Sequence, residues 1–482
     1  MNSVLSAPKK STYGYEVDAV LTPTGTLPTA AIDAKSLASP AVFIVEEGRI
    51  AYVGLGEGVP ERFSALALES LPGTVIVPGF IDAHHHVIEP FAKALTCGEP
   101  AQMWKRIWMP LEAVATEQSC FDGAKWTFSE ALRGGITTIV EHAVREMKFA
   151  EAVHAAAEET GIRLVSSVGG YDLKNFSGSG PTPAAHASID ETLRLAEQHI
   201  DNCRRYSRIY PSVACGTVQS NSPQMIGALA RFSRERNILF QIHANEHTGE
   251  VQSCIEAYSK RPIEFLQSVD ALGPTTLIAH ATLVTPREID MLVESRTAVS
   301  YNPVASIWKG NAVAPALTYA QRGVRLALGT DATRNDGFRL LDAAETCQRL
   351  AYGIPSDDFS CGAGWTWVHA ATFGGAEAIG LGAITGSLEP GKAADFLILS
   401  RSHPEVLPTW DLTWELTRFY DRADILATFV DGQAKVLQGR LTGYILDDFI
   451  REALPRGIAD IERARITRLH GTSDLYRSLH NA

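Results

Sequence analysis

The sequence predicts an α/β protein: a (β/α)₈ TIM-type barrel joined to a small discontinuous β-sandwich that both chain ends form. The barrel is predicted because eight short apolar segments alternate with stretches of helical periodicity over about 280 residues. The β-sandwich is predicted because short strands with tight-turn punctuation lie on both sides of that region. The expected barrel strands are residues 75–84, 136–143, 162–169, 209–215, 238–243, 276–281, 297–302 and 324–331.

The domain boundaries are predicted where the pattern changes. Residues 1–76 contain short strands, and Glu46-Glu47-Gly48 between two of them has the composition of a tight hairpin turn. Residues 77–384 carry the barrel pattern. Residues 385–443 return to short strands and are expected to complete the β-sandwich, and residues 444–482 are predicted to form a charged helical tail.

Composition limits the class of partner. The chain has 482 residues, of which 45% are hydrophobic and 20% charged, and this is ordinary globular composition. A net charge of −12 without any Lys/Arg run argues against nucleic-acid or membrane partners and favours a small molecule. No apolar run of about 18 residues and no signal peptide are evident. Seven cysteines without a Cys-x-x-Cys pair indicate reduced thiols in a cytoplasmic protein.

Three histidines end the first barrel strand, in the stretch Val77-Pro-Gly-Phe-Ile-Asp-Ala-His-His-His86. Alternate side chains of a strand lie on the same side, so His84 and His86 point together while His85 points away. Two converging imidazoles suit Zn²⁺, Fe²⁺ or a similar divalent ion. A chance histidine run is the alternative, and for an isolated His-x-His the two interpretations are about equally strong.

Other strand ends carry the same kinds of residue. His243 ends the fifth strand and Glu246 follows it, while His280 ends the sixth strand and Asp331 the eighth. Each alone fits a core histidine or an ordinary strand-end acid. The C-terminal ends of all barrel strands meet at one mouth, however, so together these residues predict one site there.

The motifs resemble the amidohydrolase superfamily, in the branch that contains cytosine, guanine and S-adenosylhomocysteine deaminases and the s-triazine hydrolases. The matching pieces occur in the family's order and at barrel spacing: Pro78–His86, Gly135–Thr138, His243-x-x-Glu246, His280, Val299–Val304, Gly329–Asp331 and Leu388–Asp395. The resemblance implies the following roles: His84, His86, His243 and Asp331 as metal ligands, Asp331 also as a catalytic residue, Glu246 as proton shuttle, and His280 as the histidine that orients the water or substrate.

A single metal ion is expected. Three imidazoles and one carboxylate leave a position open for water, whose pKa falls towards about 7 on such a metal. Binuclear relatives bridge two metals with a lysine at the end of strand four, whereas Tyr210-Pro-Ser-Val-Ala-Cys-Gly-Thr217 has none. We therefore expect one divalent ion per subunit, Zn²⁺ first and Fe²⁺ as the alternative.

Departures from the family pattern mark candidate substrate contacts. Ser300-Tyr-Asn-Pro303 stands where many members have His-Cys-Pro, and Ala332-Thr-Arg-Asn-Asp336 replaces a small-residue segment. Asn302, Arg334 and Asn335 are therefore candidates for substrate binding. Arg334 could clamp an anionic group, and pairing with Asp336 is an equally good interpretation.

Two tryptophans are further candidates. Trp104 and Trp108 lie four residues apart in residues 99–112, which resemble the family's substrate-covering helix, so they share one helical face. They could stack on a flat heterocycle, although core packing is the commoner use of such a pair.

The predicted function is metal-dependent hydrolysis of a C–N bond in a nitrogen heterocycle, with release of ammonia from a purine, pterin, pyrimidine or triazine. The same site could instead displace chloride or an alkylamine, or open a cyclic amide. A non-catalytic scaffold is a remote alternative, because such proteins lose ligands that this chain keeps. A homodimer or higher homo-oligomer is expected.

Overall fold

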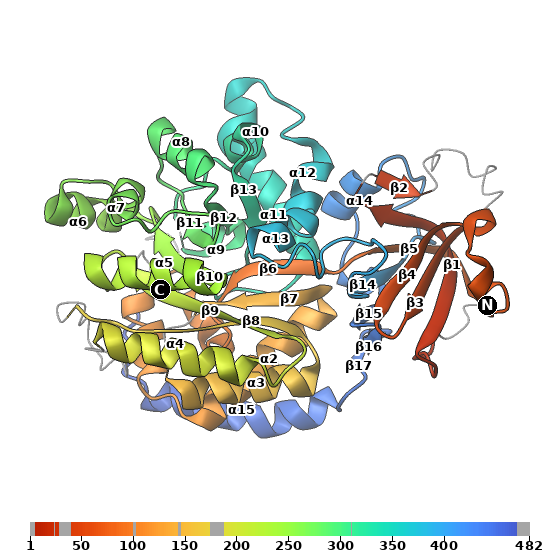
Figure 1. Cartoon of the computed structure of the whole chain (residues 1–482), viewed down its shortest axis with the longest axis horizontal. Helices are drawn as coiled ribbons and strands as arrows, with labels where there is room; N and C mark the ends of the chain where they lie inside the picture. Colours follow the sequence, from red (N-terminus) through yellow and green to blue (C-terminus); the bar gives the residue numbers. More distant parts are fainter. Residues whose placement is uncertain are drawn as a thin grey trace, which may run out of the picture.

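The computed structural model describes residues 5–23, 25–27, 40–99, 103–142, 146–173, 188–309 and 311–469. Its larger part is a barrel of eight parallel strands, which occupies the left of Figure 1. The strands, in sheet order, are β6 (Phe80–His85), β7 (Ile136–Glu141), β8 (Arg163–Gly169), β9 (Ile209–Thr217), β10 (Leu239–Ala244), β11 (Thr276–His280), β12 (Ala298–Tyr301) and β13 (Arg325–Leu328). The predicted (β/α)₈ barrel is confirmed.

Helices surround the barrel and follow its strands (Figure 1). Their starts are set by local chemistry, because Ser188, Ser222 and Thr285 each accept a backbone N–H at a helix N-terminus. The helices of the barrel region are α2 (Glu117–Arg133), α3 (Met147–Thr160), α4 (Ile189–Cys203), α5 (Pro223–Arg236), α6 (Thr248–Tyr258), α7 (Pro262–Ser268), α8 (Pro286–Ser295), α9 (Pro303–Lys309), α10 (Ala316–Arg322), α11 (Gly337–Gln348), α12 (Ala363–Ala370) and α13 (Phe373–Ala378).

A separate mixed sheet contains strands from both chain ends, as predicted, and lies on the right of Figure 1. β5 pairs in parallel with β1 and antiparallel with β14, which joins the two ends in one sheet. Tyr15, Phe43, Phe396 and Phe429 form its buried aromatic core. The strands are β1 (Thr12–Thr22), β2 (Gly25–Leu27), β3 (Ala41–Glu46), β4 (Arg49–Leu55), β5 (Glu69–Pro78), β14 (Phe396–Ser400), β15 (Ile425–Val430), β16 (Gln433–Leu437) and β17 (Arg440–Leu441).

The segment expected as one strand over residues 75–84 is two strands that belong to different sheets. β5 ends at Pro78 in the mixed sheet, and β6 begins at Phe80 in the barrel. Gly79 allows this change, because a Cβ there would lie 2.2 Å from the Thr137 hydroxyl. The domain boundaries themselves stay predictions.

The segment after β6 covers the barrel mouth and is backed by the C-terminal region. It consists of the short helices η3 (Pro90–Thr96), η4 (Met103–Lys105) and α1 (Trp108–Glu112). Trp104 and Trp108 pack in one apolar cluster with Ile461 and Ile466. The latter two residues belong to α15 (Leu446–Arg463) and to the chain that follows it. Residues 470–482 of the predicted helical tail lie outside the described residues.

A buried carboxylate fixes this contact. Glu99 accepts hydrogen bonds from Arg106 at 2.6 Å, from Arg468 at 3.3 Å and from the Leu469 backbone N–H at 2.8 Å. The Thr467 N–H also donates to the Arg106 carbonyl at 3.0 Å. Residues 467–469 therefore hold the segment over the barrel mouth in place, although they are far from it in the sequence.

Barrel and mixed sheet are joined by a buried ion pair. The Arg163 guanidinium, on β8, donates to both oxygens of Asp395 at 2.8 and 3.1 Å, and both side chains are nearly inaccessible to solvent. Asp395 also accepts from the Thr385 hydroxyl and from the Asp431 N–H. Among the described residues, no helix is long and apolar enough to cross a membrane.

We predict that Asp395→Asn destabilises the protein by about 3 kcal/mol, because it removes the buried counter-charge of Arg163 and leaves the guanidinium only the partly exposed Asp431. The melting temperature, measured by differential scanning calorimetry, should fall by several degrees. Glu46→Gln is the control, because its pair with Arg62 is solvent-exposed and such pairs contribute about 0–1 kcal/mol. Equal, small shifts for both variants would contradict the prediction.

Candidate active site

The predicted strand-end residues come together at the barrel mouth. Asp331 follows β13, and its backbone N–H donates to the His84 carbonyl of β6 at 2.8 Å. Its Oδ1 lies 3.9 Å from His84 Nε2 and 3.5 Å from His86 Nε2. The ring centroids of His84 and His243 are 4.8 Å apart. Asp331 has a left-handed backbone, with φ 56°, which turns its side chain back over the mouth.

Hydrogen bonds fix which ring nitrogens face the cluster. His243 Nδ1 donates to the Gly216 carbonyl at 2.7 Å, so its Nε2 carries a free lone pair. The Ser300 hydroxyl donates a hydrogen bond to Asn302 Oδ1, which fixes the orientation of the Asn302 amide. Asn302 Nδ2 then donates to His280 Nδ1 at 3.2 Å. His280 therefore carries its proton on Nε2, which suits donation to water or substrate rather than metal ligation.

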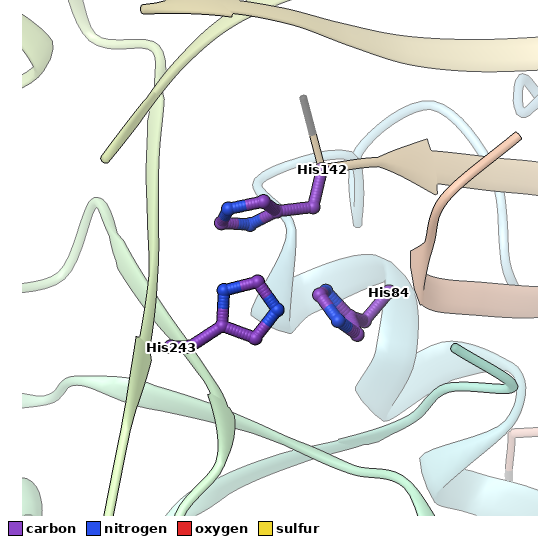
Figure 2. A group of neighbouring side chains, drawn as sticks. All are labelled: His84, His142 and His243. Carbon is purple, nitrogen blue, oxygen red and sulfur yellow. The ribbon is translucent and has the colours of Figure 1, made fainter. Parts of the chain in front are cut away.

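The cluster has a fifth histidine that the sequence analysis missed. His142 follows β7, and Figure 2 shows its ring turned towards the rings of His84 and His243. Ligand atoms of these three residues lie within 4.8 Å of one another. Neither ring nitrogen of the buried His142 has a hydrogen-bond partner in the structure. The strand-end position could have identified it, since Glu141-His142 ends the second predicted strand.

The donor set fits a divalent metal ion. Nε2 of His84 and Nε2 of His280 are buried without a hydrogen-bond partner, which is costly unless a ligand, ion or water engages them. Burial and the neighbouring imidazoles lower the pKa of His84 well below its usual range, so its ring is neutral and able to coordinate. Neutral imidazoles beside an ionised carboxylate are ligands of borderline divalent metals.

His85 and Asn335 lie on the far side of the strand end. His85 Nδ1 is 2.8 Å from the Thr330 hydroxyl, and Asn335 Nδ2 lies 3.3 Å from the same nitrogen and from Asp82 Oδ2. Burial raises the pKa of Asp82 to about 7 despite these contacts. The structure therefore places Asn335 in a buried network behind the candidate metal-binding histidines and not in the cavity wall.

Glu246 lies at the cavity, close to His280. Its Oε1 is 3.8 Å from His280 Nε2 and accepts a hydrogen bond from Asn311 Nδ2 at 2.9 Å. Burial alone would raise its pKa, but the neighbouring His280 and Lys309 outweigh burial and lower the pKa to about 2. Glu246 is therefore ionised at neutral pH and ready to accept a proton.

Lys309 is a second residue that the sequence analysis missed. It ends α9, lines the cavity and forms an ion pair with Asp331 Oδ2. Burial opposes its charge, but Asp331 and Glu246 outweigh burial and raise its pKa above the usual value. Its position eight residues after Tyr301, the last residue of β12, gave no strand-end signal.

The remaining candidates divide between cavity and scaffold. Trp104 and Trp108 line the cavity. Trp108 is only 4% exposed, and both tryptophans belong to the apolar cluster that the segment over the barrel mouth forms with the C-terminal region. Arg334 does not line the cavity, because its guanidinium pairs with Asp336 at 2.8 Å. A role for Arg334 in substrate choice stays a prediction.

A second group, His154, His199 and Cys203, also has metal-ligand composition but lies outside the barrel mouth. His154 bonds Asn202 and Ser166 through its two ring nitrogens, and His199 bonds the Ser166 carbonyl. This group is a satisfied polar network that ties α3 and α4 to β8.

Comparison with known proteins agrees with this geometry. The chain is 27% identical over 411 residues to a 5-methylthioadenosine/S-adenosylhomocysteine deaminase of Syntrophobacter fumaroxidans, covering 85% of this chain and 91% of the relative. It is 29% identical over 383 residues to a 5'-deoxyadenosine deaminase of Methanothermobacter thermautotrophicus, covering 77% and 83%.

Solved structures share the fold. An adenosine deaminase from Xanthomonas campestris with bound zinc superposes with a TM-score of 0.81 at 23% identity, covering 93% of this chain and 98% of the other. Atrazine chlorohydrolase TrzN from Arthrobacter aurescens TC1, complexed with zinc, gives a TM-score of 0.79 at 19% identity, covering 93% and 100%. The model of the Amidohydrolase family matches residues 75–435, which is more than half of the chain. The family resemblance is thereby confirmed, and the chain belongs to the amidohydrolase family.

Proposed function

We propose that this protein is a zinc-dependent aminohydrolase that releases ammonia from an amino-substituted nitrogen heterocycle, with a 5'-modified adenosine as the first candidate. One observation carries the proposal: buried histidines and Asp331 surround a point beside the ionised Glu246, at a cavity walled by Trp104 and Trp108. The names of the curated relatives support an adenosine derivative.

We assign His84, His86, His243 and Asp331 as the residues that would hold the ion, one per subunit. The four side chains converge, and the fixed tautomer of His243 presents a lone pair. A divalent ion bound there supplies a water molecule whose pKa is lowered towards neutrality. Strand β9 offers no lysine to bridge a second ion.

The chain's own residues then handle the protons. Asp331 Oδ2 lies 3.8 Å from His280 Nε2, so these two groups are placed to orient the attacking water on both sides. Glu246, ionised at rest, takes a proton and delivers it to the ring nitrogen next to the reacting carbon. The oxygen of water ends on that carbon as a carbonyl, the second proton of water passes to the amino group, and that group leaves as ammonia.

The same residues would serve the alternatives in which chloride or an alkylamine leaves, or a cyclic amide opens. Similarity to a chlorohydrolase supports only the fold at this identity. A cytoplasmic location and a homo-oligomeric assembly stay predictions.

We predict about one zinc per chain by inductively coupled plasma mass spectrometry, because four ligands converge and no bridging lysine exists. Chelation should abolish activity and lower the melting temperature, since an ion that binds only the folded state stabilises it. His84→Ala should lose the metal, whereas His403→Ala should keep it, because His403 pairs with Glu405 away from the site. Two ions per chain, or full activity without metal, would refute the assignment.

We predict that Glu246→Gln keeps its metal but loses about 10²–10⁴-fold in kcat, because an amide cannot accept the proton. Glu256→Gln, on the exposed side of α6, is the matched control and should retain full activity. A loss below tenfold would mean that another group shuttles the proton.

We predict that an ammonia-release assay ranks 5'-modified adenosines above guanine and an amino-triazine, with no chloride released from atrazine. Trp104→Ala should lower kcat/KM for these flat substrates at unchanged metal content, because Trp104 lines the cavity and its indole ring would stack on the heterocycle. Trp410→Ala is the control, because Trp410 is an exposed tryptophan that does not line the cavity. Preferential chloride release would favour the alternative function.

A further inference from the structure

One connection of the chain contacts three of the groups that handle protons at the barrel mouth. It runs from the end of β12 to the start of β13 and contains α9. Asn302 contacts the strand-six histidine, Lys309 pairs with the strand-eight aspartate, and Asn311 donates to Glu246. The three contacts anchor the described parts of this connection against three different strand ends.

Glu246 is held at its backbone as well as at its side chain. Its backbone N–H donates to Glu250 Oε2 at 2.8 Å, and the Thr282 hydroxyl donates to its carbonyl at 2.5 Å. With the backbone fixed in this way, the contact of Asn311 Nδ2 with Oε1 at 2.9 Å decides how the carboxylate is turned. The contacts of the carboxylate with Asn311 and His280 are both made by Oε1, so Oε2 is the oxygen left to meet a substrate in the cavity that Glu246 lines.

The chemistry of an amide adds a directional constraint. The Nδ2 group of Asn311 can only donate, so it accepts no hydrogen bond from a protonated carboxyl oxygen. A carboxyl oxygen that carries a proton is a much weaker acceptor than the other oxygen, so the Asn311 hydrogen bond to Oε1 favours the tautomer with the proton on Oε2. Oε1 accepts from Asn311 in both the ionised and the protonated state, and the proton is carried on Oε2.

We propose that Asn311 is a positioning residue for proton transfer, which occupies Oε1 of Glu246 so that the shuttled proton is carried on Oε2, facing the substrate. The inference rests on the proposed function, because it requires Glu246 to be the shuttle. It adds to the site a residue, Asn311, that lies outside every motif named in the sequence analysis.

Asn311→Ala and Asn311→Asp test the proposal, because the first removes the donor and the second replaces it with an acceptor of the same shape. Both should lower kcat about tenfold or more, with KM changed less than about threefold and metal content unchanged; tenfold corresponds to about 1.4 kcal/mol. Gln219→Ala is the matched control, since Gln219 is a half-buried amide on a neighbouring mouth loop that bonds the Gly249 carbonyl.

A double-mutant cycle with Glu246→Gln separates positioning from a general structural effect. If Asn311 acts through Glu246, Asn311→Ala should have little further effect on kcat once the shuttle is gone. The same fold-loss in both backgrounds, or no loss in the single variant, would overturn the inference. Glu246→Gln with near-normal activity would instead refute the proposed shuttle itself, so the two failures are distinguishable.

Discussion

The closure of the barrel between its first and last strands is the constraint on which the site depends. The hydrogen bond from the Asp331 N–H to the His84 carbonyl joins the ends of β13 and β6 and puts an acid and an imidazole side by side. A parallel barrel brings every strand's C-terminal end to the same rim, so His243 and His280 reach the same point from the other side. How the sheet closes therefore decides which side chains meet at the site.

Burial of so many polar groups in one place requires compensation. Asp331 and Glu246 remain ionised because the nearby Lys309 ammonium offsets the cost of removing them from water. His84 and His280 show the opposite effect, since burial holds their pKa values low and keeps their rings neutral. A site with neutral nitrogen donors and ionised oxygen donors is suited to a cation, and that pattern follows from packing as much as from residue type.

The sequence alone predicted the barrel, the shared sheet of the two chain ends and the convergence of the strand-end residues. It succeeded there because a strand's apolar pattern and its last residue are local features. His142 was missed although the same rule applies to it, since no family motif drew attention to a single histidine. Lys309 and Asn311 could not be found by that rule, because their approach depends on the path of the connection after β12. For Arg334 the sequence left open whether the guanidinium binds an anionic substrate group or Asp336, and in the structure it pairs with Asp336.

The contact between Glu99 and the chain after α15 has a consequence for biosynthesis. The barrel strands are complete once residue 328 has been made, but the tryptophan wall of the cavity gains its backing only when residues 461–469 emerge. In a growing chain, the strand-end histidines and Asp331 are thus made before the residues that pack behind Trp104 and Trp108. The cavity wall is therefore completed after the barrel strands have been made, which separates the folding of the scaffold in time from the maturation of its pocket.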